Sequence, residues 1–299
     1  MATKYLVTGG AGFIGSNLTD ALIAQGHDVL VLDNLSTGKK ENINPKATFI
    51  NADIRRLEQI KPYFVGVDHV FHIAALPRVQ LSIENPAETN DVNVNGTLNV
   101  LIAAKDAKVE RVVYSASSSA YGDAKTMPLS EEMRPNPLSP YGLQKYIGEE
   151  YCRLFSLLCG LQTVSLRYFN VYGPRMAGEG AYLTVIKNFL MQKSQGKPMT
   201  ITGDGEQTRD FTHVRDVVRA NISAMESKNV GAGEVINIGA GKNYSMNQIA
   251  AFIGGPSVHI APRVEPRHTL ADNSKAKKFL GWTPQENLEE AIKELTDSE

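Results

Sequence analysis

The segment "SPYGLQKYIGEE" places Tyr141 and Lys145 four residues apart. On a helix this spacing puts both side chains on one face. An ammonium beside a phenol stabilises the phenolate and lowers its pKa, so the tyrosine can serve as a base near neutral pH. Taken alone, the pair could equally be an ordinary exposed pair on a helix.

A stretch of serines, "YSASSSAYG", follows an apolar run and carries Ser117 at the end of a predicted strand. A hydroxyl in that place can bond a substrate oxygen while a neighbouring base removes its proton. Ser117 together with the Tyr-Lys pair favours a catalytic site over a chance pairing of side chains.

A glycine-rich turn suggests what chemistry these groups assist. Gly9, Gly12 and Gly15 follow the apolar run "YLVTG" and open a helical pattern. Glycines permit a tight turn and let the backbone approach a pyrophosphate, whose charge the first amides of the helix can meet. Three glycines could also make only a tight strand-helix turn. Asp33, eighteen positions after Gly15, ends the next apolar run. Its carboxylate can accept bonds from the adenosine ribose and repel a 2′-phosphate, which favours NAD over NADP.

Four further positions belong to this predicted cofactor site. Asp53 and Ile54 end the third strand and could meet the amino edge of the adenine, although Asp53 could instead cap a helix. In "HIAAL" the small residues Ala74 and Ala75 stand where a backbone must pass close to the cofactor. His72 comes before the exposed end of its strand, so we expect a buried histidine with satisfied hydrogen bonds rather than a catalyst.

Short apolar runs alternate with helical patterns through the first half of the chain, which predicts a doubly wound parallel α/β (Rossmann) sheet. Helices are expected over Gly15–Gln25 and Val92–Ala107. After Asn170 the chain is rich in Gly and Pro, and "GKPMTITGDGEQTRDF" predicts a hairpin or a loop. The strands are expected in "YLVTGG", "DVLVLDN", "ATFINAD", "HVFHIAA", "VERVVYSAS", "QTVSLRYFN" and, near the end, "VGAGEVINIGAG".

These elements predict two parts. Residues 1–169, with return segments near 210–240, are expected to form the NAD-binding Rossmann domain. Residues 170–209 and 241–299 are expected to form a smaller, interleaved C-terminal domain for the substrate.

Composition narrows the class of protein. The 299 residues are 42% apolar and 21% charged, with a formal net charge of −1 and no block of like charge, so neither nucleic acid nor a membrane is an expected partner. The chain runs from Met1 into a strand without the zones of a signal peptide, which predicts a cytoplasmic protein. Cys152 and Cys159 lie seven apart in a helical pattern, and we expect two buried thiols rather than a disulfide.

Beyond these local arguments, the chain resembles the nucleotide-sugar epimerases of the extended short-chain dehydrogenase/reductase family, of the UDP-glucose and UDP-N-acetylglucosamine 4-epimerase kind. The similarity runs nearly end to end, and several motifs together are far more specific than one. They are "TGGAGFIGSNL", "DNLSTG", "HIAA", "VNVNGT", "SASSSAYG", "SPYGLQK", "LRYFNVYGPR", "GDGEQTRDFTHVRD" and "LADNSKA".

The resemblance implies roles for individual residues. Ser117, Tyr141 and Lys145 become the catalytic set, and the last two also touch the cofactor. Further cofactor contacts fall on Phe13, Ile14, Asn34, Ser36, Thr37, Gly38 and Phe169. The substrate residues are Ser117 and Tyr141 at the sugar, Asn170, Arg209 and Arg263 at the diphosphate, Glu265 at the uridine ribose, Thr200 and Thr202 at the base, and Thr269 beside the C2 substituent of the sugar. No metal site is expected.

The implied reaction is reversible C4 epimerisation of a UDP-hexose through a transient 4-keto sugar, with NAD resident on the enzyme. Because Thr269 is small where related enzymes carry Tyr, UDP-N-acetylglucosamine and its galacto epimer are expected substrates beside UDP-glucose and UDP-galactose. A UDP-glucuronate 4-epimerase, another NAD-dependent nucleotide-sugar enzyme and a non-catalytic NAD-binding protein remain alternatives. Ser118 and Ser119 stand where the dehydratases carry an Asp-Glu pair, which disfavours elimination.

The resemblance also predicts a homodimer, formed through a four-helix bundle of the segments Val92–Ala107 and Tyr141–Cys159 from two copies. Two positions depart from the family pattern. Pro77 replaces a Lys of the best-known members, and Val92 replaces a frequent Asn. Both departures concern expected contacts with the cofactor.

Overall fold

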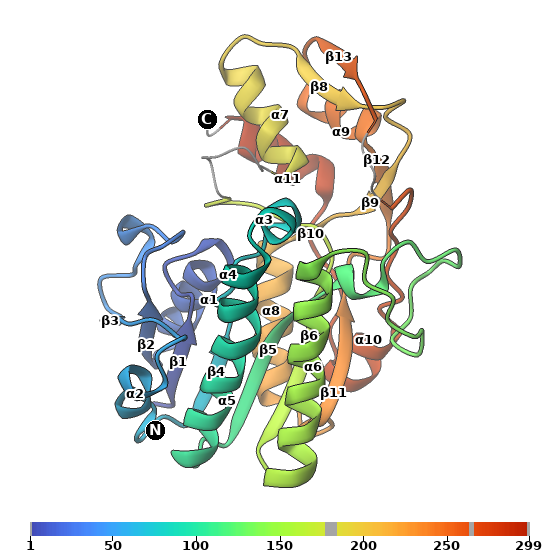
Figure 1. Cartoon of the computed structure of the whole chain (residues 1–299). Coiled ribbons are helices and arrows are strands. Elements are labelled where there is room, and N and C mark those ends of the chain that lie inside the picture. Colours follow the sequence, from blue (N-terminus) through green and yellow to red (C-terminus); the bar gives the residue numbers. More distant parts are fainter. Residues whose placement is uncertain (1, 177–183, 263–265, 298–299) are drawn as a thin grey trace.

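The computed structural model describes residues 2–176, 184–262 and 266–297. Its main body is a parallel sheet of seven strands in the order β11-β6-β5-β4-β1-β2-β3 (Figure 1). The predicted doubly wound sheet is confirmed, and each apolar run named above coincides with one of its strands, β1 starting one residue before its run. They are β1 (Lys4–Thr8), β2 (Asp28–Asp33), β3 (Thr48–Asn51), β4 (His69–His72), β5 (Arg111–Ser117), β6 (Gln162–Tyr168) and β11 (Ala232–Ile238).

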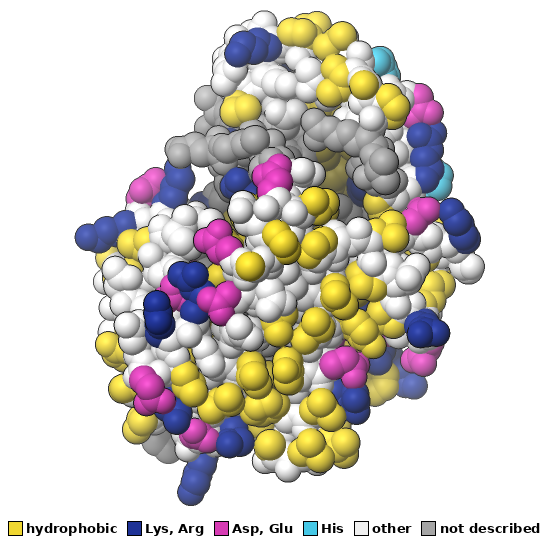
Figure 2. All heavy atoms as spheres, viewed as in Figure 1, with side chains coloured by type: hydrophobic (Ala, Val, Ile, Leu, Met, Phe, Trp, Pro, Cys, Tyr) yellow, Lys and Arg dark blue, Asp and Glu magenta, His cyan; other side chains and the backbone are white. Residues whose placement is uncertain are grey.

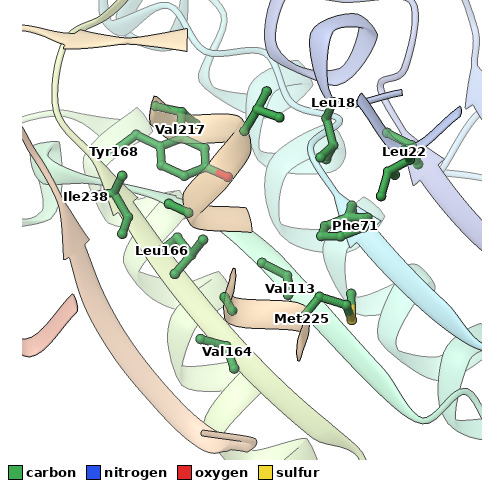
Figure 3. Close-up of a cluster of buried hydrophobic side chains, with 14 of the residues drawn as sticks. Leu18, Leu22, Phe71, Val113, Val164, Leu166, Tyr168, Val217, Met225 and Ile238 are labelled. Atoms are coloured by element: carbon green, nitrogen blue, oxygen red, sulfur yellow. The ribbon is translucent and has the colours of Figure 1, made fainter. Parts of the chain in front are cut away.

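Helices cover both faces of this sheet, which explains why its central strands are almost continuously apolar. On one face, α1 (Phe13–Ala24), α8 (Val214–Glu226) and α10 (Ser274–Leu280) pack on the strands. Figure 3 shows this core, in which Leu18, Leu22 and Val217 of the helices meet strand residues such as Phe71, Val113 and Leu166. On the other face, α5 (Thr97–Asp106) and α6 (Pro140–Cys159) bury their own apolar side chains.

The helix predicted over 92–107 is part of a longer one. α4 (Pro86–Asn90) continues through a π-helical turn, η3 (Asp91–Gly96), into α5. A Cβ on Gly96 would lie 2.6 Å from Ile54 Cδ1, so glycine lets this helix approach the segment after β3. The short helices nearby are η1 (Lys40–Asn42), α2 (Leu57–Ile60), η2 (Lys61–Phe64) and α3 (Val79–Glu84).

The ends of α6 follow from its sequence. Ser139 accepts a hydrogen bond from the Gly142 amide, Pro140 opens the helix, and Gly160 ends it with φ +70°. The prediction of two buried thiols on α6 is half wrong. Cys152 is buried against the sheet, whereas Cys159 is exposed because it is the last residue of the helix; both thiols are free.

A smaller lobe stands above the carboxyl ends of the strands (Figure 1). Its core joins Phe189, Ile201, Ile249 and Ile292. The hairpin considered for "GKPMTITGDGEQTRDF" does not form, because β8 pairs in parallel with β13 while β9 pairs antiparallel with β12. The remaining elements are β7 (Val171–Tyr172), α7 (Val185–Ser194), β8 (Met199–Thr202), β9 (Thr208–Asp210), β10 (Thr212–His213), β12 (Asn243–Ser245), α9 (Met246–Ile253), β13 (Ser257–Ile260) and α11 (Leu288–Asp297).

The proposed division of the chain into two domains stays a prediction. One element departs from it, since α10 follows residue 241 but packs on α8 and β11 of the sheet. Trp282, just after α10, also donates from its indole to the carbonyl of Asp216 in α8 at 2.9 Å. Among the residues that the structure describes, no helix combines the length and apolar character needed to cross a membrane.

Candidate active site

The parallel strands bring most of the predicted site residues to one edge of the sheet. β1 leads into Gly9, β2 ends at Asp33, β5 ends at Ser117 and β6 leads into Phe169. Strand order reverses at β1, which lies between β2 and β4. A crevice at such a reversal, beyond the carboxyl ends of the strands, is where doubly wound sheets bind ligands.

The glycine turn has little room for side chains. A Cβ on Gly15 would lie 2.2 Å from the Gly9 carbonyl oxygen, and one on Gly9 would lie 2.7 Å from the Ala74 backbone. On Gly12 the nearest atom to a Cβ would be the Gly9 oxygen at 3.2 Å. In this described segment no side chain caps α1 and no acidic residue stands in its first turn. The amides at the start of α1 are therefore available to an anion such as a pyrophosphate.

Asp33 is bound into the same turn. Its Oδ2 accepts from the Ala11 amide at 3.0 Å, and its Oδ1 accepts from the Leu35 amide at 2.8 Å. Burial raises the pKa of this carboxyl, and the two amide bonds oppose that rise. Each oxygen keeps a lone pair, so the carboxylate can still accept from ribose hydroxyls. The residues of the turn and Asp33 thus fit a dinucleotide.

Asp53 is partnered by other side chains. Arg55 donates to it from both Nε and Nη2, and Asn34 donates from Nδ2 at 3.1 Å. These bonds, the Arg55 contact above all, lower the pKa of Asp53 to about 2. Asp53 is not the N-cap of α2, since that position belongs to Arg56. Whether Asp53 or Ile54 meets the adenine stays a prediction.

The other predicted cofactor residues differ in exposure. Ser36 and Thr37 are exposed, and a Cβ on Gly38 would lie 2.8 Å from the Ala11 side chain. Phe169 is fully buried against Tyr121, Leu129 and Ala271, so its side chain packs inside the protein. The remaining positions line the turn or the segment after β4: Phe13, Ile14, Ala74 and Ala75.

Tyr141 and Lys145 lie four residues apart on α6, as their spacing predicted, and this part of α6 packs against the end of β5 that carries Ser117. The Ser117 hydroxyl is the polar side chain that lowers the pKa of the Tyr141 phenol. Ser119 donates its hydroxyl to Ser117 Oγ at 2.8 Å, which leaves the Ser117 proton for Tyr141. Lys145 donates from Nζ to the Ser115 carbonyl at 2.7 Å and lies over the Tyr114 ring. A hydroxyl, a phenol and an ammonium thus share one end of β5.

Burial dominates the titration of this set. It raises the pKa of Tyr141 to about 12 and lowers the pKa of Lys145 to about 7. Both shifts disfavour the charged forms of the side chains. The expectation that Lys145 lowers the pKa of Tyr141 is therefore not met in this structure, because burial outweighs the lowering effect of Ser117.

His72 is a structural residue, as predicted. Its Nδ1 lies 2.7 Å from Thr8 Oγ1 and its Nε2 lies 2.9 Å from Thr97 Oγ1. Thr97 donates its own hydroxyl proton to the Asn93 carbonyl, so it must accept from His72 Nε2. Complete burial lowers the pKa of His72 to about 3, which keeps the ring neutral. Neither ring nitrogen is left for catalysis.

Two of the predicted substrate residues, Asn170 and Thr269, lie next to each other in the structure. Asn170 Nδ2 lies 3.4 Å from Thr269 Oγ1 and donates to the Asp210 carbonyl at 2.9 Å. Arg209 is next to Asp210 and donates from Nη1 to the Thr208 carbonyl at 2.9 Å. Asn170 has a φ of +32°, a conformation rare for residues other than glycine and frequent at functional sites.

The remaining substrate predictions are placed less directly. Thr200 on β8 is bonded to Gln192 of α7 by both its hydroxyl and its amide, and Thr202 ends the same strand. Whether these two threonines border the base stays a prediction. Arg263 and Glu265 lie outside the described residues. In the described part of the chain, no group of three His, Cys, Asp or Glu residues could hold a metal ion.

Asn93 is a residue that the sequence reasoning missed. Its fully buried amide accepts from the Leu76 amide at 2.8 Å and donates to the Leu76 carbonyl at 3.1 Å and to Gln144 of α6. Asn93 therefore connects the segment of Leu76 and Pro77 with helix α6. Val92 packs against the apolar core beneath α5. The motif "VNVNGT", which contains Asn93, was used only as a mark of family resemblance, and the structural role of Asn93 was not predicted.

A buried ion pair was also missed. Arg167 of β6 donates from Nε and Nη2 to the two oxygens of Glu149, at 2.9 and 2.6 Å. Its guanidinium lies 4.5 Å from the centre of the Tyr121 ring, and Tyr121 donates to Asn237. The ion pair joins α6, one turn beyond Lys145, to β6. The contact of Arg167 with the Tyr121 ring extends this link to the segment after Ser117. A helix residue and a strand residue eighteen positions apart give no periodic signal in the sequence.

Comparisons with known proteins agree with this geometry. A model of the NAD dependent epimerase/dehydratase family matches residues 5–239. This chain belongs to that family. It is an NAD-dependent nucleotide-sugar epimerase of the extended short-chain dehydrogenase/reductase type, and the predictions of family, enzyme class and cofactor are confirmed.

Individual relatives span the whole chain. A protein of Methanocaldococcus jannaschii named as a putative UDP-glucose 4-epimerase is 43% identical, with 98% of this chain and 97% of the relative covered. The structure of a Thermotoga maritima UDP-glucose 4-epimerase with UDP-glucose has a TM-score of 0.94 at 40% identity, covering 99% and 98% of the two chains. A Methanobrevibacter ruminantium UDP-N-acetylglucosamine 4-epimerase, in complex with UDP-N-acetylmuramic acid, has a TM-score of 0.94 at 36% identity, covering 99% and 97%.

Proposed function

We propose that this epimerase interconverts the C4 epimers of UDP-hexoses by transient oxidation of C4. The observation that carries the proposal is the packing of the first turns of α6 against the end of β5: Lys145 Nζ donates to the Ser115 carbonyl at 2.7 Å, at the same edge of the sheet as the glycine turn. A base, a hydroxyl donor and a dinucleotide site at one edge suit removal of a proton from a sugar hydroxyl and of a hydride from the carbon that bears it.

The side chains divide the work as follows. Tyr141 takes the proton of the C4 hydroxyl, and Ser117 bonds the same oxygen. The glycine turn and Asp33 would hold NAD, which would supply reversible hydride transfer at C4 without net consumption. Lys145 supplies positive charge near the phenol. Asn170, Arg209 and the predicted Arg263 hold the diphosphate, which lets the 4-keto sugar turn its other face while the nucleotide stays bound.

The residues after Ser117 argue against loss of water or carbon dioxide from the keto intermediate. Ser118 and Ser119 carry no carboxyl group, and Ser119 uses its hydroxyl proton to bond Ser117. Elimination needs an additional acid or base at this point. Epimerisation needs only that the hydride and the proton return.

We further propose that the enzyme accepts UDP-N-acetylglucosamine and UDP-N-acetylgalactosamine as well as the plain pair. Thr269 is a small, half-buried residue next to Asn170. It leaves room for an acetamido group, and one of the similar structures is that of a UDP-N-acetylglucosamine 4-epimerase.

The test is to incubate purified enzyme separately with UDP-glucose, UDP-N-acetylglucosamine and UDP-glucuronate, and to resolve C4 epimers by NMR. Wild type should turn over the first two. Thr269→Tyr should stop turnover of the acetylated pair by steric exclusion and spare the plain pair, while Thr269→Ser, the matched control, should keep both. Wild type that takes only plain sugars, or a Tyr variant that takes both, would refute the assignment of Thr269.

The predicted homodimer remains our proposal. Leu143, Leu157 and Leu158 of α6 are exposed, Leu158 by 74%. Figure 2 shows hydrophobic side chains gathered over α5 and α6, on the face that a four-helix bundle would bury. Sedimentation of the full chain as a monomer would contradict this assembly. The cytoplasmic location likewise stays a prediction.

A further inference from the structure

Asp210, the last residue of β9, is fully buried and joins two distant segments. Its Oδ1 accepts from the Ala240 amide at 2.7 Å. Its Oδ2 accepts from the Gly241 amide at 2.9 Å and from the Ala271 amide at 3.0 Å. One carboxylate therefore fixes the loop after β11 to the segment that precedes α10.

The backbone of Asp210 reaches the predicted substrate residues. Its carbonyl accepts from Asn170 Nδ2 at 2.9 Å, and its amide lies 3.3 Å from Thr269 Oγ1. Arg209 directly precedes it, and the Thr269 amide donates to the Thr208 carbonyl at 3.1 Å. The side chain of Asp210 thus holds the segment of Thr269, while its main chain holds Asn170.

Close packing around the Asp210 carboxylate restricts its position. A Cβ on Gly239 would lie 2.3 Å from the Ala271 side chain and 3.0 Å from Asp210 Oδ2, so the three backbones meet without spare room. Burial raises the pKa of Asp210 to about 6, and the three amide bonds oppose the rise. A buried carboxyl is costly unless donors surround it, and here all three donors are backbone amides.

We propose that Asp210 is a positioning residue for the substrate: its carboxylate fixes the segment of Thr269 against Asn170 and Arg209, so that a nucleoside diphosphate meets a preformed site. The inference rests on the proposed function. An asparagine in this place has one acceptor oxygen, and its NH2 group would face at least one backbone amide donor. The three segments would then no longer be held together.

The experiment uses the NAD-loaded full-length protein and UDP as the probe. Asp210→Asn should weaken UDP binding by calorimetry at least tenfold and raise KM for UDP-glucose by a similar factor. Its kcat should stay within about threefold of wild type, and its NAD content should be unchanged. Asp272→Asn is the matched control, since Asp272 lies in the same segment but accepts from Ser274, in its own turn. The control should bind UDP as wild type does.

An Asp210→Asn protein that retains NAD and binds UDP normally would overturn the proposal, as would one whose kcat falls while KM stays constant. If the variant does not fold, hydrogen exchange on the wild-type holoenzyme decides. UDP should slow exchange of the Ala240, Gly241 and Ala271 amides together, and a change at Ala271 alone would overturn the proposal. Wild type that binds UDP without epimerising any sugar would refute the proposed function and leave this inference standing. Wild type that does not bind UDP would refute both.

Discussion

The predicted cofactor end centres on one stretch of chain, Thr8 to Ser16, with Asp33 bonded to its Ala11 amide. The predicted substrate end instead gathers Asn170, Asp210, Ala240 and Thr269, which lie up to 99 residues apart in the chain. The first end depends on local backbone geometry, where a single Cβ would clash. The second depends on hydrogen bonds between distant segments, which one side chain can coordinate. The two ends should therefore respond separately to substitution, and Ser117, Tyr141 and Lys145 should connect them.

The largest loss of activity is expected for a substitution of Tyr141, which lies between the two ends. Tyr141→Phe removes only the ionisable oxygen, so kcat should fall on the order of 10³-fold while NAD and UDP remain bound. Tyr146→Phe, on the next turn of α6, is the matched control and should keep its activity. A Tyr141→Phe enzyme within tenfold of wild type would show that another group is the base.

A smaller effect is expected for Ser117→Ala. The Ser117 hydroxyl lowers the pKa of Tyr141, so its loss raises that pKa. Because the base acts when deprotonated, the acidic limb of the kcat profile should move to higher pH, and kcat at neutral pH should fall about 100-fold. Ser118→Ala controls for disturbance of the turn. If the acidic limb stayed at its wild-type pH, Ser117 would have no effect on the titration of Tyr141.

The smallest effect is expected at the cofactor end alone. Asp33→Asn removes the charge that repels a 2′-phosphate, so the preference for NAD over NADP should fall about tenfold, by titration of the two dinucleotides. UDP affinity should stay constant if the two ends are independent. Asp28→Asn, at the exposed start of the same strand, should change neither. If Asp33→Asn lowered the affinities for both NAD and UDP, the cofactor end and the substrate end would not be independent.

The same contrast explains how much the sequence predicted. The sheet and the glycine turn were predictable because apolar runs and glycine spacing are local signals. The shared helix face of Tyr141 and Lys145 was predictable because four residues make about one helical turn. Asn93 and Arg167 were not, since their partners lie on other elements and no spacing relates them.

At the substrate end, Asn170, Arg209 and Thr269 were proposed only from resemblance to a family. Asp210 was overlooked inside a quoted motif, because its partners are backbone amides whose positions depend on the complete fold. Cys159 was misplaced for a related reason: helical spacing indicates a face but not how far a helix extends past the sheet.

The central claim is that C4 of the sugar is oxidised and then reduced again in one active site, with the same NAD bound throughout. It is tested most directly with UDP-glucose carrying deuterium at C4, incubated with purified enzyme and no added dinucleotide. NMR should show UDP-galactose with the deuterium retained at C4, because the hydride that leaves returns to the same carbon. Loss of deuterium to solvent, or a requirement for added NAD in every turnover, would contradict the account.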